Sequence, residues 1–531
     1  MLSRRNLLAA ATALAAPKEA RAATPQVLRI AMTSADLPTV TGIPNNGGEG
    51  GRFLGFPVYD ALVNWDFTKT DATADIRPGL LSEWHIDPAN NLRWICKVRP
   101  GVTFHDGSAL DADAIIWNLR RIYDDKSPQY DAPAAPIISA SVSMLAGWEK
   151  IDAMSLAITT RFPFGYFPYM MARIFIASPA QWEKQGRSWA NVAKAPSGSG
   201  PFKITRIAPG QYVEMSRNES YWEAARIPKL DKLMVYPMPE ATTRLAALRS
   251  GQVDWIEVPP PDAIPSLKAA GFQISLWPYP HTYPYVLNTL PGSPFADVRV
   301  RRAANYAIDR EGLCKLINGT GKPAVGLYPP ESPYFGKPSN HYGYDPAKAR
   351  ALLAEAGYGP GKPLQAKIMI STAGSGQMVP IPMNEYLQQS LKAVGIEVAF
   401  DVVEWGTMLV AVRSAPMAAP SHGDDAINIS LGYSDPSTMF RYYAKDSYSP
   451  TNWNWGHWSS EKTDELLTKA QATFDPAEQT RLLAEAHGII VDEAPWLFIV
   501  HDLNPRAMSK KVKGFNPAQS WYQDFTQISM A

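Results

Sequence analysis

A strand–helix–strand pattern in the second half of the chain restricts the folds that this sequence can adopt. Residues 364–372 and 396–405 each have the composition of a strand, and residues 384–395 between them have that of a helix. A parallel pair of strands needs a crossover connection, and a helix is the usual one. Because further strand and helix stretches follow one another along the chain, we predict a fold of the α/β class.

The length and composition of the chain set further limits. Its 531 residues are too many for one hydrophobic core, so two to four domains are expected. Hydrophobic residues make up 46% and charged residues 19%, a balance typical of globular rather than disordered chains. The 51 basic and 50 acidic residues nearly cancel, which gives no support for a nucleic-acid partner.

Residues 1–22 have the features of an export signal. Arg4 and Arg5 precede a short, weakly apolar stretch, and Ala20 to Ala22 fit an A-x-A cleavage pattern. The paired arginines are similar to a twin-arginine signal, and a general secretory signal is the alternative. No later apolar run reaches 18 residues, so we predict no membrane span and a periplasmic protein cleaved near Ala22.

The chain contains two cysteines, Cys96 and Cys314. Neither lies at the cleavage site, so the mature N-terminus has no thiol to carry a lipid. The two residues fall in different predicted domains, which favours two separate buried thiols over a disulfide.

Several helices can be predicted from their end signals and apolar spacing. Residues 297–317 read as helical, with an apolar stripe and with the arginines on a solvated face. Asp345 caps the next helix, which Gly357 ends. Residues 461–474 and 478–493 are two more helices, and a late strand follows at 494–502.

Local motifs for catalysis or metal binding are missing from the sequence. The eight histidines show no H-E-x-x-H spacing, and no cysteine pair has the spacing of a zinc site. We find no G-x-S-x-G elbow and no G-x-G-x-x-G fingerprint after a strand. A carboxylate pair for glycoside hydrolysis has no sequence signal either. We therefore predict no catalytic residue, no metal site and no cofactor, although distant residues can assemble such sites.

Six stretches, in order along nearly the whole mature chain, resemble the extracytoplasmic solute-binding proteins of ABC importers, in the peptide and nickel class (family 5). The most specific is "NTLPGSPFADVRVRRAANYAIDREGL", and "SGSGPFKI" resembles a glycine-rich strand start with Ser199 in a threonine position. The others are 97–122, 248–254, 344–358 and 491–502. Each alone is weak, but their order behind an export signal is specific.

This resemblance implies a periplasmic-binding-protein type of fold, with two lobes, a hinge (class II-like) and an extra domain on the larger lobe. The implied division is 23–57, 197–285 and 496–531 for the core of lobe 1, 58–196 for the extra domain and 286–495 for lobe 2. The chain would cross between lobes near 285–288 and 495–500. A small-molecule ligand would lie in the interlobe cleft of a monomer, and an ABC permease of the inner membrane would be the partner.

The loop at 429–443, "ISLGYSDPSTMFRYY", departs from the peptide-binding pattern of this family. In peptide binders an Asp, three residues before an acid–Pro pair, holds the α-ammonium of the peptide. Aligning Asp435 and Pro436 with that pair places Gly432 at the ammonium-binding position. Asp435 is then expected to cap a helix that begins at Pro436. Either the ligand has no free α-ammonium here, or another acid supplies the charge.

Six residues are candidates for ligand contact, each with surface or packing roles as the alternative. Glu49 could replace the missing acid, Arg52 could meet a carboxylate, and Trp405 could stack on the ligand after its strand. The others are Gly432, Tyr433 and Trp453.

Di- or oligopeptides are the default ligands of the class, and opines, sugar derivatives and nickel complexes are the alternatives. An exported hydrolase and a holding chaperone or adhesion protein are rival functions.

Overall fold

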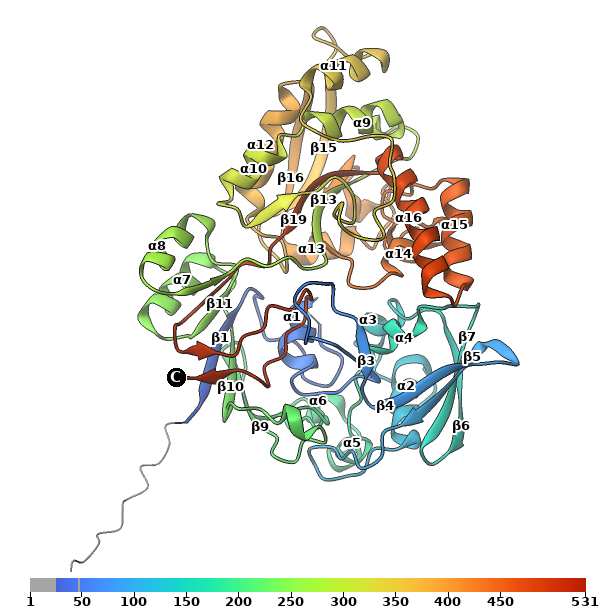
Figure 1. Cartoon of the computed structure of the whole chain (residues 1–531), viewed down its shortest axis with the longest axis vertical. Helices are drawn as coiled ribbons and strands as arrows, with labels where there is room; N and C mark the ends of the chain where they lie inside the picture. Colours follow the sequence, from blue (N-terminus) through green and yellow to red (C-terminus); the bar gives the residue numbers. More distant parts are fainter. Residues whose placement is uncertain (1–24, 46–47) are drawn as a thin grey trace, which may run out of the picture.

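The computed structural model describes residues 25–45 and 48–531, which form two lobes with a large sheet in each (Figure 1). The predicted export signal at residues 1–22 lies outside the described residues. Among the residues that are described, no helix has both the length and the apolar character needed to cross a bilayer.

The sheet of the first lobe is built around β1 (Val27–Met32), the first strand of the described chain. β1 runs parallel to β10 (Lys232–Pro237) and to β11 (Trp255–Glu257), and every other pairing in this sheet is antiparallel. The full order is β12-β20-β11-β1-β10-β9-β8. The outer strands are β8 (Phe202–Ala208), β9 (Tyr212–Arg217), β12 (Gln273–Ser275) and β20 (Arg506–Met508).

The sheet of the second lobe contains the predicted strand–helix–strand unit. β15 (Leu364–Ser371) and β16 (Ile396–Val403) pair in parallel along their whole length, and α12 (Pro380–Lys392) connects them. This confirms the α/β class. The order is β14-β19-β13-β17-β15-β16, with β18 (Leu431–Gly432) paired to β13. The remaining strands are β13 (His281–Leu287), β14 (Gly321–Pro323), β17 (Ala426–Asn428) and β19 (Trp496–Asp502).

A third, antiparallel sheet forms the extra domain beside the first lobe (Figure 1). Its order is β4-β5-β7-β6. Asp111 caps the N-terminus of α2 (Ala112–Tyr123), because its carboxylate accepts a hydrogen bond from Ala114 N at 2.9 Å. The four strands are β4 (Leu81–Asp87), β5 (Asn90–Val98), β6 (Leu145–Asp152) and β7 (Ser155–Thr160).

Shorter elements complete the first lobe and the extra domain. They are α1 (Gly48–Gly50), a π-helical turn (Gly51–Gly55), β2 (Val63–Trp65), β3 (Ile76–Pro78), α3 (Ala135–Ser139), α4 (Phe167–Met171), α5 (Pro179–Lys184), α6 (Trp189–Val192), α7 (Ala241–Ser250), α8 (Ile264–Ala269), β21 (Val512–Lys513) and β22 (Ser529–Met530).

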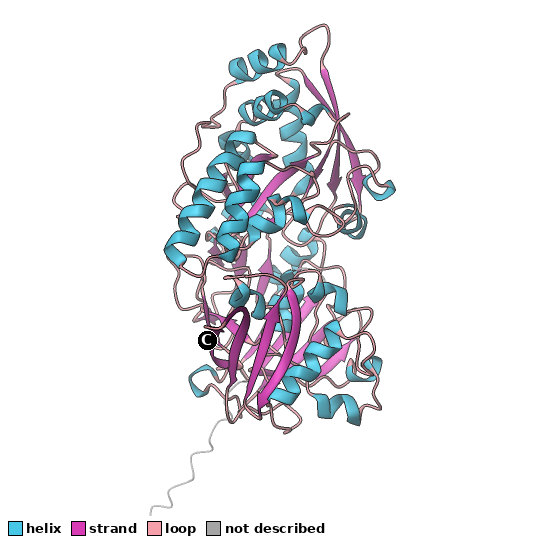
Figure 2. Ribbon diagram, turned by 90° about the vertical axis from the view of Figure 1, so that its right-hand side faces the viewer, coloured by secondary structure: helices cyan, strands magenta, loops and turns pink. Residues whose placement is uncertain are grey.

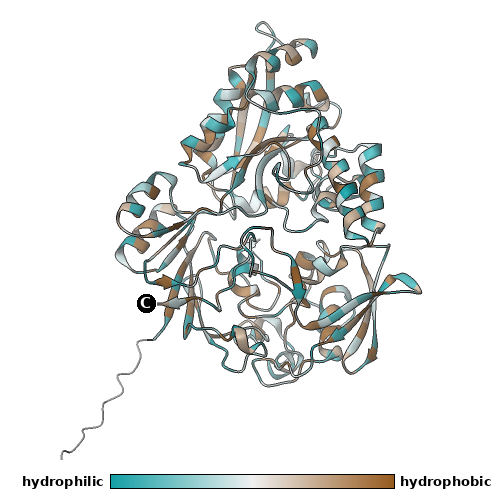
Figure 3. Cartoon of the chain, viewed as in Figure 1, coloured by the Kyte–Doolittle hydropathy of each residue, from teal (hydrophilic) through white to brown (hydrophobic). Residues whose placement is uncertain are grey.

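Helices cover the sheet of the second lobe. α15 and α16 form a pair above the four-stranded sheet of the extra domain (Figure 2). Both alternate hydrophobic and hydrophilic residues along their length, as helices with one buried face do (Figure 3). The helices here are α9 (Val298–Ala307), α10 (Arg310–Leu316), α11 (Pro346–Glu355), α13 (Trp405–Ala411), α14 (Thr438–Tyr443), α15 (Glu461–Ala472) and α16 (Pro476–Glu493).

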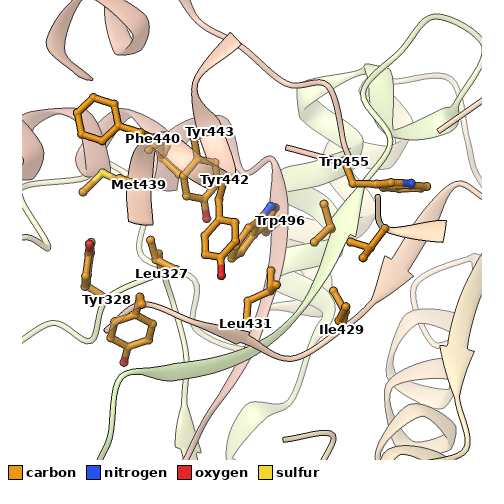
Figure 4. Packing of buried hydrophobic residues seen from close by; sticks show 14 of the residues in the cluster. Leu327, Tyr328, Ile429, Leu431, Met439, Phe440, Tyr442, Tyr443, Trp455 and Trp496 are labelled. Carbon is orange, nitrogen blue, oxygen red and sulfur yellow. The ribbon is translucent and has the colours of Figure 1, made fainter. Parts of the chain in front are cut away.

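Aromatic side chains fill the core between α14 and the second sheet. The ring centroids of Tyr443 and Tyr442 lie 4.8 and 5.4 Å from that of Trp496 on β19 (Figure 4). The prediction of two separate buried thiols is confirmed, because Cys96 and Cys314 are both free and buried.

The chain passes between the two large sheets twice. The first connection joins β12 to β13 and the second joins β19 to β20. β13 and β19 pair with each other inside the second sheet. The boundary expected at 285/286 therefore cuts through β13, and the one expected at 495/496 assigns the whole of β19 to the wrong lobe. The crossings lie instead at residues 276–280 and 503–505.

One prediction about the helical segment 297–317 is wrong. The segment breaks into α9 and α10, and two of its arginines are buried rather than solvated. Arg301 donates hydrogen bonds to the carbonyl oxygens of Phe295, Ala296 and Glu493.

Arg310 is tied to carbonyl oxygens even more extensively. Its guanidinium donates to those of Asn305, Ile308, Ala324, Tyr342 and Phe498. Each buried guanidinium therefore provides hydrogen-bond donors to several backbone carbonyl groups.

Replacing Arg310 by Ala should lower the free energy of unfolding by at least about 3 kcal/mol, because several buried carbonyl groups lose their donor together. Replacing the exposed Arg350 of α11 by Ala is the control and should change it by less than about 0.5 kcal/mol. Urea unfolding followed by circular dichroism measures both. Equal effects of the two substitutions would contradict this role for Arg310.

The two crossings are linked by a buried carboxyl group. Asp502, the last residue of β19, accepts hydrogen bonds at 2.7 Å from the Tyr279 hydroxyl and from Asn504 N. Burial raises the pKa of Asp502 to about 6. The stability that this group contributes is present below its unfolded pKa and is lost as the pH rises through 6.

Replacing Asp502 by Asn should therefore remove a pH-dependent loss of stability. Between pH 5 and pH 7 the free energy of unfolding of D502N should rise relative to wild type by about 1.4 kcal/mol. Denaturant unfolding of both proteins across this range provides the measurement. Parallel pH profiles would show that Asp502 does not titrate in this window.

Candidate functional site

The loops that follow the parallel strands of both sheets meet at the interface between the lobes. α1 follows β1 in the first lobe, and α13 follows β16 in the second. The two helices lie on the sides of the lobes that face each other (Figure 1). In open α/β sheets, ligands bind outside the carboxyl ends of parallel strands. This interface is therefore the candidate site.

Contacts on the side away from the crossings hold the two lobes together. Arg173, just after α4, donates to the carboxylate of Asp435 in the second lobe at 2.8 Å. Gly165 N donates to Gln471 O at 2.8 Å, and Phe164 lies 6.5 Å from Phe440 between ring centroids. The lobes thus touch at both ends of their interface, so the structure shows a closed arrangement.

Loop 372–379 after β15 extends from the second lobe to the first. A Cβ atom added to Gly376 would lie 2.7 Å from His281 and 2.9 Å from Trp521, which belongs to the C-terminal segment of the first lobe. Trp521 also lies against Gly48, beside Glu49. The backbone of this loop therefore lies directly against the Trp521 ring of the first lobe, and a side chain at position 376 has no room.

Several buried polar atoms of these loops have no hydrogen-bond partner among the described residues. They include Thr33 Oγ1 and Ser34 Oγ after β1, and Ser375 Oγ and Gln377 Oε1 after β15. An unpartnered buried polar group costs about 1–3 kcal/mol, so such groups need an explanation. A polar molecule held between the lobes would supply the missing partners.

Glu49 and Arg52 lie at this interface, but both are committed to the first lobe. Glu49 accepts a hydrogen bond from Thr33 N at 2.9 Å, and burial raises its pKa. Arg52 forms an ion pair with the buried Glu257 and donates to Trp521 O. The structure therefore places Arg52 in an internal network and gives Glu49 one unpartnered oxygen.

Trp405 supports the loop that reaches across the interface. A Cβ atom on Gly374 would lie 2.5 Å from the Trp405 ring, so the backbone of the loop packs directly on the indole. Trp453 lies beside α14, under the guanidinium groups of Arg441 and Arg413, which are 4.5 and 5.3 Å from its ring centroid.

Gly432 and Tyr433 differ in how much space surrounds them. Gly432 pairs with His281, and a Cβ atom added there would have no contact shorter than 3.7 Å. Tyr433 is buried, and its hydroxyl lies 3.3 Å from His501 Nδ1. Position 432 therefore has room for a larger side chain.

The expectation that Asp435 caps the following helix is wrong. α14 begins at Thr438, with Ser437 as its cap residue. The Asp435 carboxylate accepts hydrogen bonds from Ser437 N and from Arg173. The carboxylate therefore orders the turn before the helix and anchors a residue of the opposite lobe.

Sequence reasoning missed Arg173 and Arg441. Arg441 lies in the expected helix and Arg173 in the expected extra domain, but nothing in either stretch indicates that folding brings the two together near Asp435. Only the position of Asp435 in the family's acid–Pro pair pointed to this part of the site.

In the described part of the chain, one group of possible metal ligands lies away from this interface. Single ligand atoms of Asp401, His422 and Asp424 all lie within 4.8 Å of one another. The ammonium group of Lys367 is 3.0 Å from Asp424 and 3.7 Å from Asp401, and His422 Nδ1 is 2.6 Å from Asp401. The lysine already supplies a positive charge to these carboxylates.

Comparison with known proteins agrees with the architecture. Residues 75–453 match the family model of bacterial extracellular solute-binding proteins, family 5 Middle. The glutathione-binding protein GsiB of Escherichia coli strain K12 is 30% identical over 450 residues, which cover 82% of this chain and 83% of that protein.

Two solved structures share the fold. The periplasmic binding protein DppA from Helicobacter pylori, in complex with the peptide STSA, superposes with a TM-score of 0.80 at 23% identity and covers 95% of this chain and 98% of its own. AgaA from A. tumefaciens R10, in complex with agropinic acid, gives 0.75 at 22% identity and covers 95% and 99%. The chain belongs to the family 5 bacterial extracellular solute-binding proteins.

Proposed function

We propose that this protein captures one small polar solute between its lobes, outside the cytoplasm, and delivers it unchanged to an ABC permease. The observation that carries the proposal is the set of unpartnered buried polar atoms on loops of both lobes, where those lobes meet. A solute that bonds to both sets at once would bind the closed arrangement more tightly than an open one.

The connections between the lobes support a hinge at residues 276–280 and 503–505. Both are short and lie side by side, as the bond between Tyr279 and Asp502 requires. At the other end the contacts are an ion pair, a backbone hydrogen bond and a few aromatic rings. Such contacts can separate at modest cost, so a ligand can shift the population between open and closed forms.

The solute class is narrowed by Gly432. No carboxylate stands at the position where peptide binders of the family hold an α-ammonium, and Glu49 is buried with a raised pKa. The relatives described above bind glutathione, a peptide or agropinic acid. We propose a solute without a free α-ammonium group at this point, such as an opine-like or conjugated compound.

A hydrolase remains the rival function. It requires chemical conversion of the bound compound, whereas the relatives named above are binding proteins. Recovering the solute after binding distinguishes the two functions directly.

The proposed capture predicts compaction and stabilisation by a fitting solute. At a solute concentration of 100 Kd the free energy of unfolding should increase by about 2.7 kcal/mol. A thermal-shift screen of opines, amino-acid conjugates, sugar acids, peptides and nickel complexes should find such compounds, and X-ray scattering should show a smaller radius of gyration with each. Mass spectrometry should recover the solute unchanged. Conversion of the compound, or stabilisation without compaction, would contradict the proposal.

Position 432 offers a test of the ligand preference. Gly432→Asp should fit without steric strain and should introduce an anchor for an α-ammonium. The affinity for the peptide STSA should then exceed that for its N-acetylated form by about tenfold, a preference absent from wild type. Gly432→Asn, with a side chain of the same size and no charge, is the control. A wild-type protein that already prefers the free amine would show that another acid supplies the anchor.

A further inference from the structure

We propose that the solute carries a carboxylate group, which Arg441 and Arg413 of the second lobe bind and Arg173 of the first lobe covers on closure. This inference rests on the proposed capture function and names the chemical class of its ligand. It is carried by three guanidinium groups gathered at the interface with a single carboxylate among them.

The three arginines come from separate elements. Arg441 is in α14, Arg413 follows α13, and Arg173 follows α4 in the opposite lobe. Arg441 and Arg413 share the ring of Trp453, and Arg173 reaches the same region through Asp435. The fold therefore brings positively charged groups of both lobes together near Trp453 and Asp435.

Arg441 and Arg413 have no anionic partner. Neither forms an ion pair or a hydrogen bond with any described residue, and their contacts are with the aromatic rings of Trp453 and, for Arg441, Tyr442. Arg441 Nε is buried without a partner, and so is Arg173 Nε. The cluster thus has free donors as well as unbalanced charge.

The surroundings of Arg441 disfavour a charged guanidinium that has no anionic partner. Burial lowers the pKa of Arg441, and the positive charges of Arg173 and Arg413 add to this effect, while Tyr442 and Asp435 oppose it. A guanidinium does not lose its proton under ordinary conditions in proteins. Because an unpaired buried charge is costly, the cluster is completed by an anion rather than by deprotonation.

Carboxylate is the anion that this arrangement fits. A guanidinium presents its donors in a planar fork, which matches the two oxygens of a carboxylate. The ring of Trp453 holds the two guanidinium groups by cation–π contact and leaves their edges to donate.

The cluster also connects the ligand to closure. Bringing Arg173 toward Arg441 and Arg413 opposes like charges, and Asp435 offsets only one of the three. A bound carboxylate would lower this repulsion, so it stabilises the closed arrangement more than the open one. An uncharged analogue of the same shape would lack this effect.

A purely structural role for the cluster makes different predictions. If the arginines only fasten α13 and α14 to Trp453, replacing them by Gln should lower thermal stability and leave ligand preference unchanged. If they bind a carboxylate, the replacement should remove the preference for acids over amides. Ligand preference therefore separates the two roles even when stability falls in both.

The first experiment uses citrate as a carboxylate probe on the mature chain. Citrate should raise the melting temperature of wild type in a saturable manner, compared with sodium chloride of equal ionic strength. R441Q, R413Q and the double variant should lose this response, and the exposed control R350Q should keep it. Inorganic phosphate in a parallel titration should act more weakly. No specific response to citrate in wild type, or an equal response in the double variant, would overturn the proposal, as would stronger stabilisation by phosphate.

The second experiment uses matched pairs of acid and amide, namely glutathione and its diamide, and the peptide STSA and its C-terminal amide. For a pair that binds, the acid should bind wild type about 10- to 100-fold more tightly, and R441Q should reduce this ratio to near one. Equal binding of acid and amide to wild type would contradict the inference. A citrate response without compaction by any solute would instead contradict the proposed capture function and leave the anion site standing.

If R441Q does not fold, R413Q serves in its place, because Arg413 is more exposed and its loss removes less packing. Circular dichroism before titration establishes the folded state of each variant. Retention of the full acid preference in folded R413Q would count against a role of the pair.

Discussion

The antiparallel pairing of β13 with β19 is the constraint on which the rest of the structure depends. These strands lie at the centre of the second sheet, yet they also carry the chain into and out of the second lobe. Because they are neighbours, both connections leave the sheet at the same place. The two lobes are therefore joined along one side, and every other contact between them is non-covalent and reversible.

The non-covalent contacts combine polar groups with a few aromatic rings. Arg173 binds Asp435 across the interface, and loop 372–379 places unpartnered polar atoms close to the first lobe. A wholly apolar interface would favour the closed form even without a ligand, since the burial of apolar surface alone stabilises it. Closure brings little stabilisation to polar groups that lack partners unless a bound ligand supplies hydrogen bonds to them. The chemistry of the interface is thus suited to a closure that depends on a ligand.

The fold could be predicted where local pattern and tertiary packing agree. The strand–helix–strand unit, the Asp345 cap and the late strand at 494–502 follow from spacing and end signals, and the structure has all three. The buried Arg301 and Arg310 could not be predicted. An arginine in a helix is normally expected to face solvent. These two are buried because they bind carbonyl groups of residues elsewhere in the chain, such as Glu493 for Arg301 and Ala324 for Arg310.

The candidate site was predictable only in outline. The resemblance to a family made Glu49, Arg52 and Gly432 candidates for ligand contact, but it did not indicate the partners of Arg52, which are more than 200 positions away. Asp435 has a short-range alternative, a helix cap, that sequence rules favour. Its actual partner Arg173 is 262 residues distant, and no local pattern encodes such a pairing.

The close approach of Gly376 to His281 and Trp521 has a consequence for how this protein can change over generations. Its φ of +74° and its lack of space leave glycine as the residue that fits there, so that part of the wall is fixed by backbone geometry. Gly432 has neither restriction, since its φ is not positive and its surroundings are open. Under the proposed capture function, exchange at Gly432 can change the ligand preference while Gly376 keeps the loop against the first lobe.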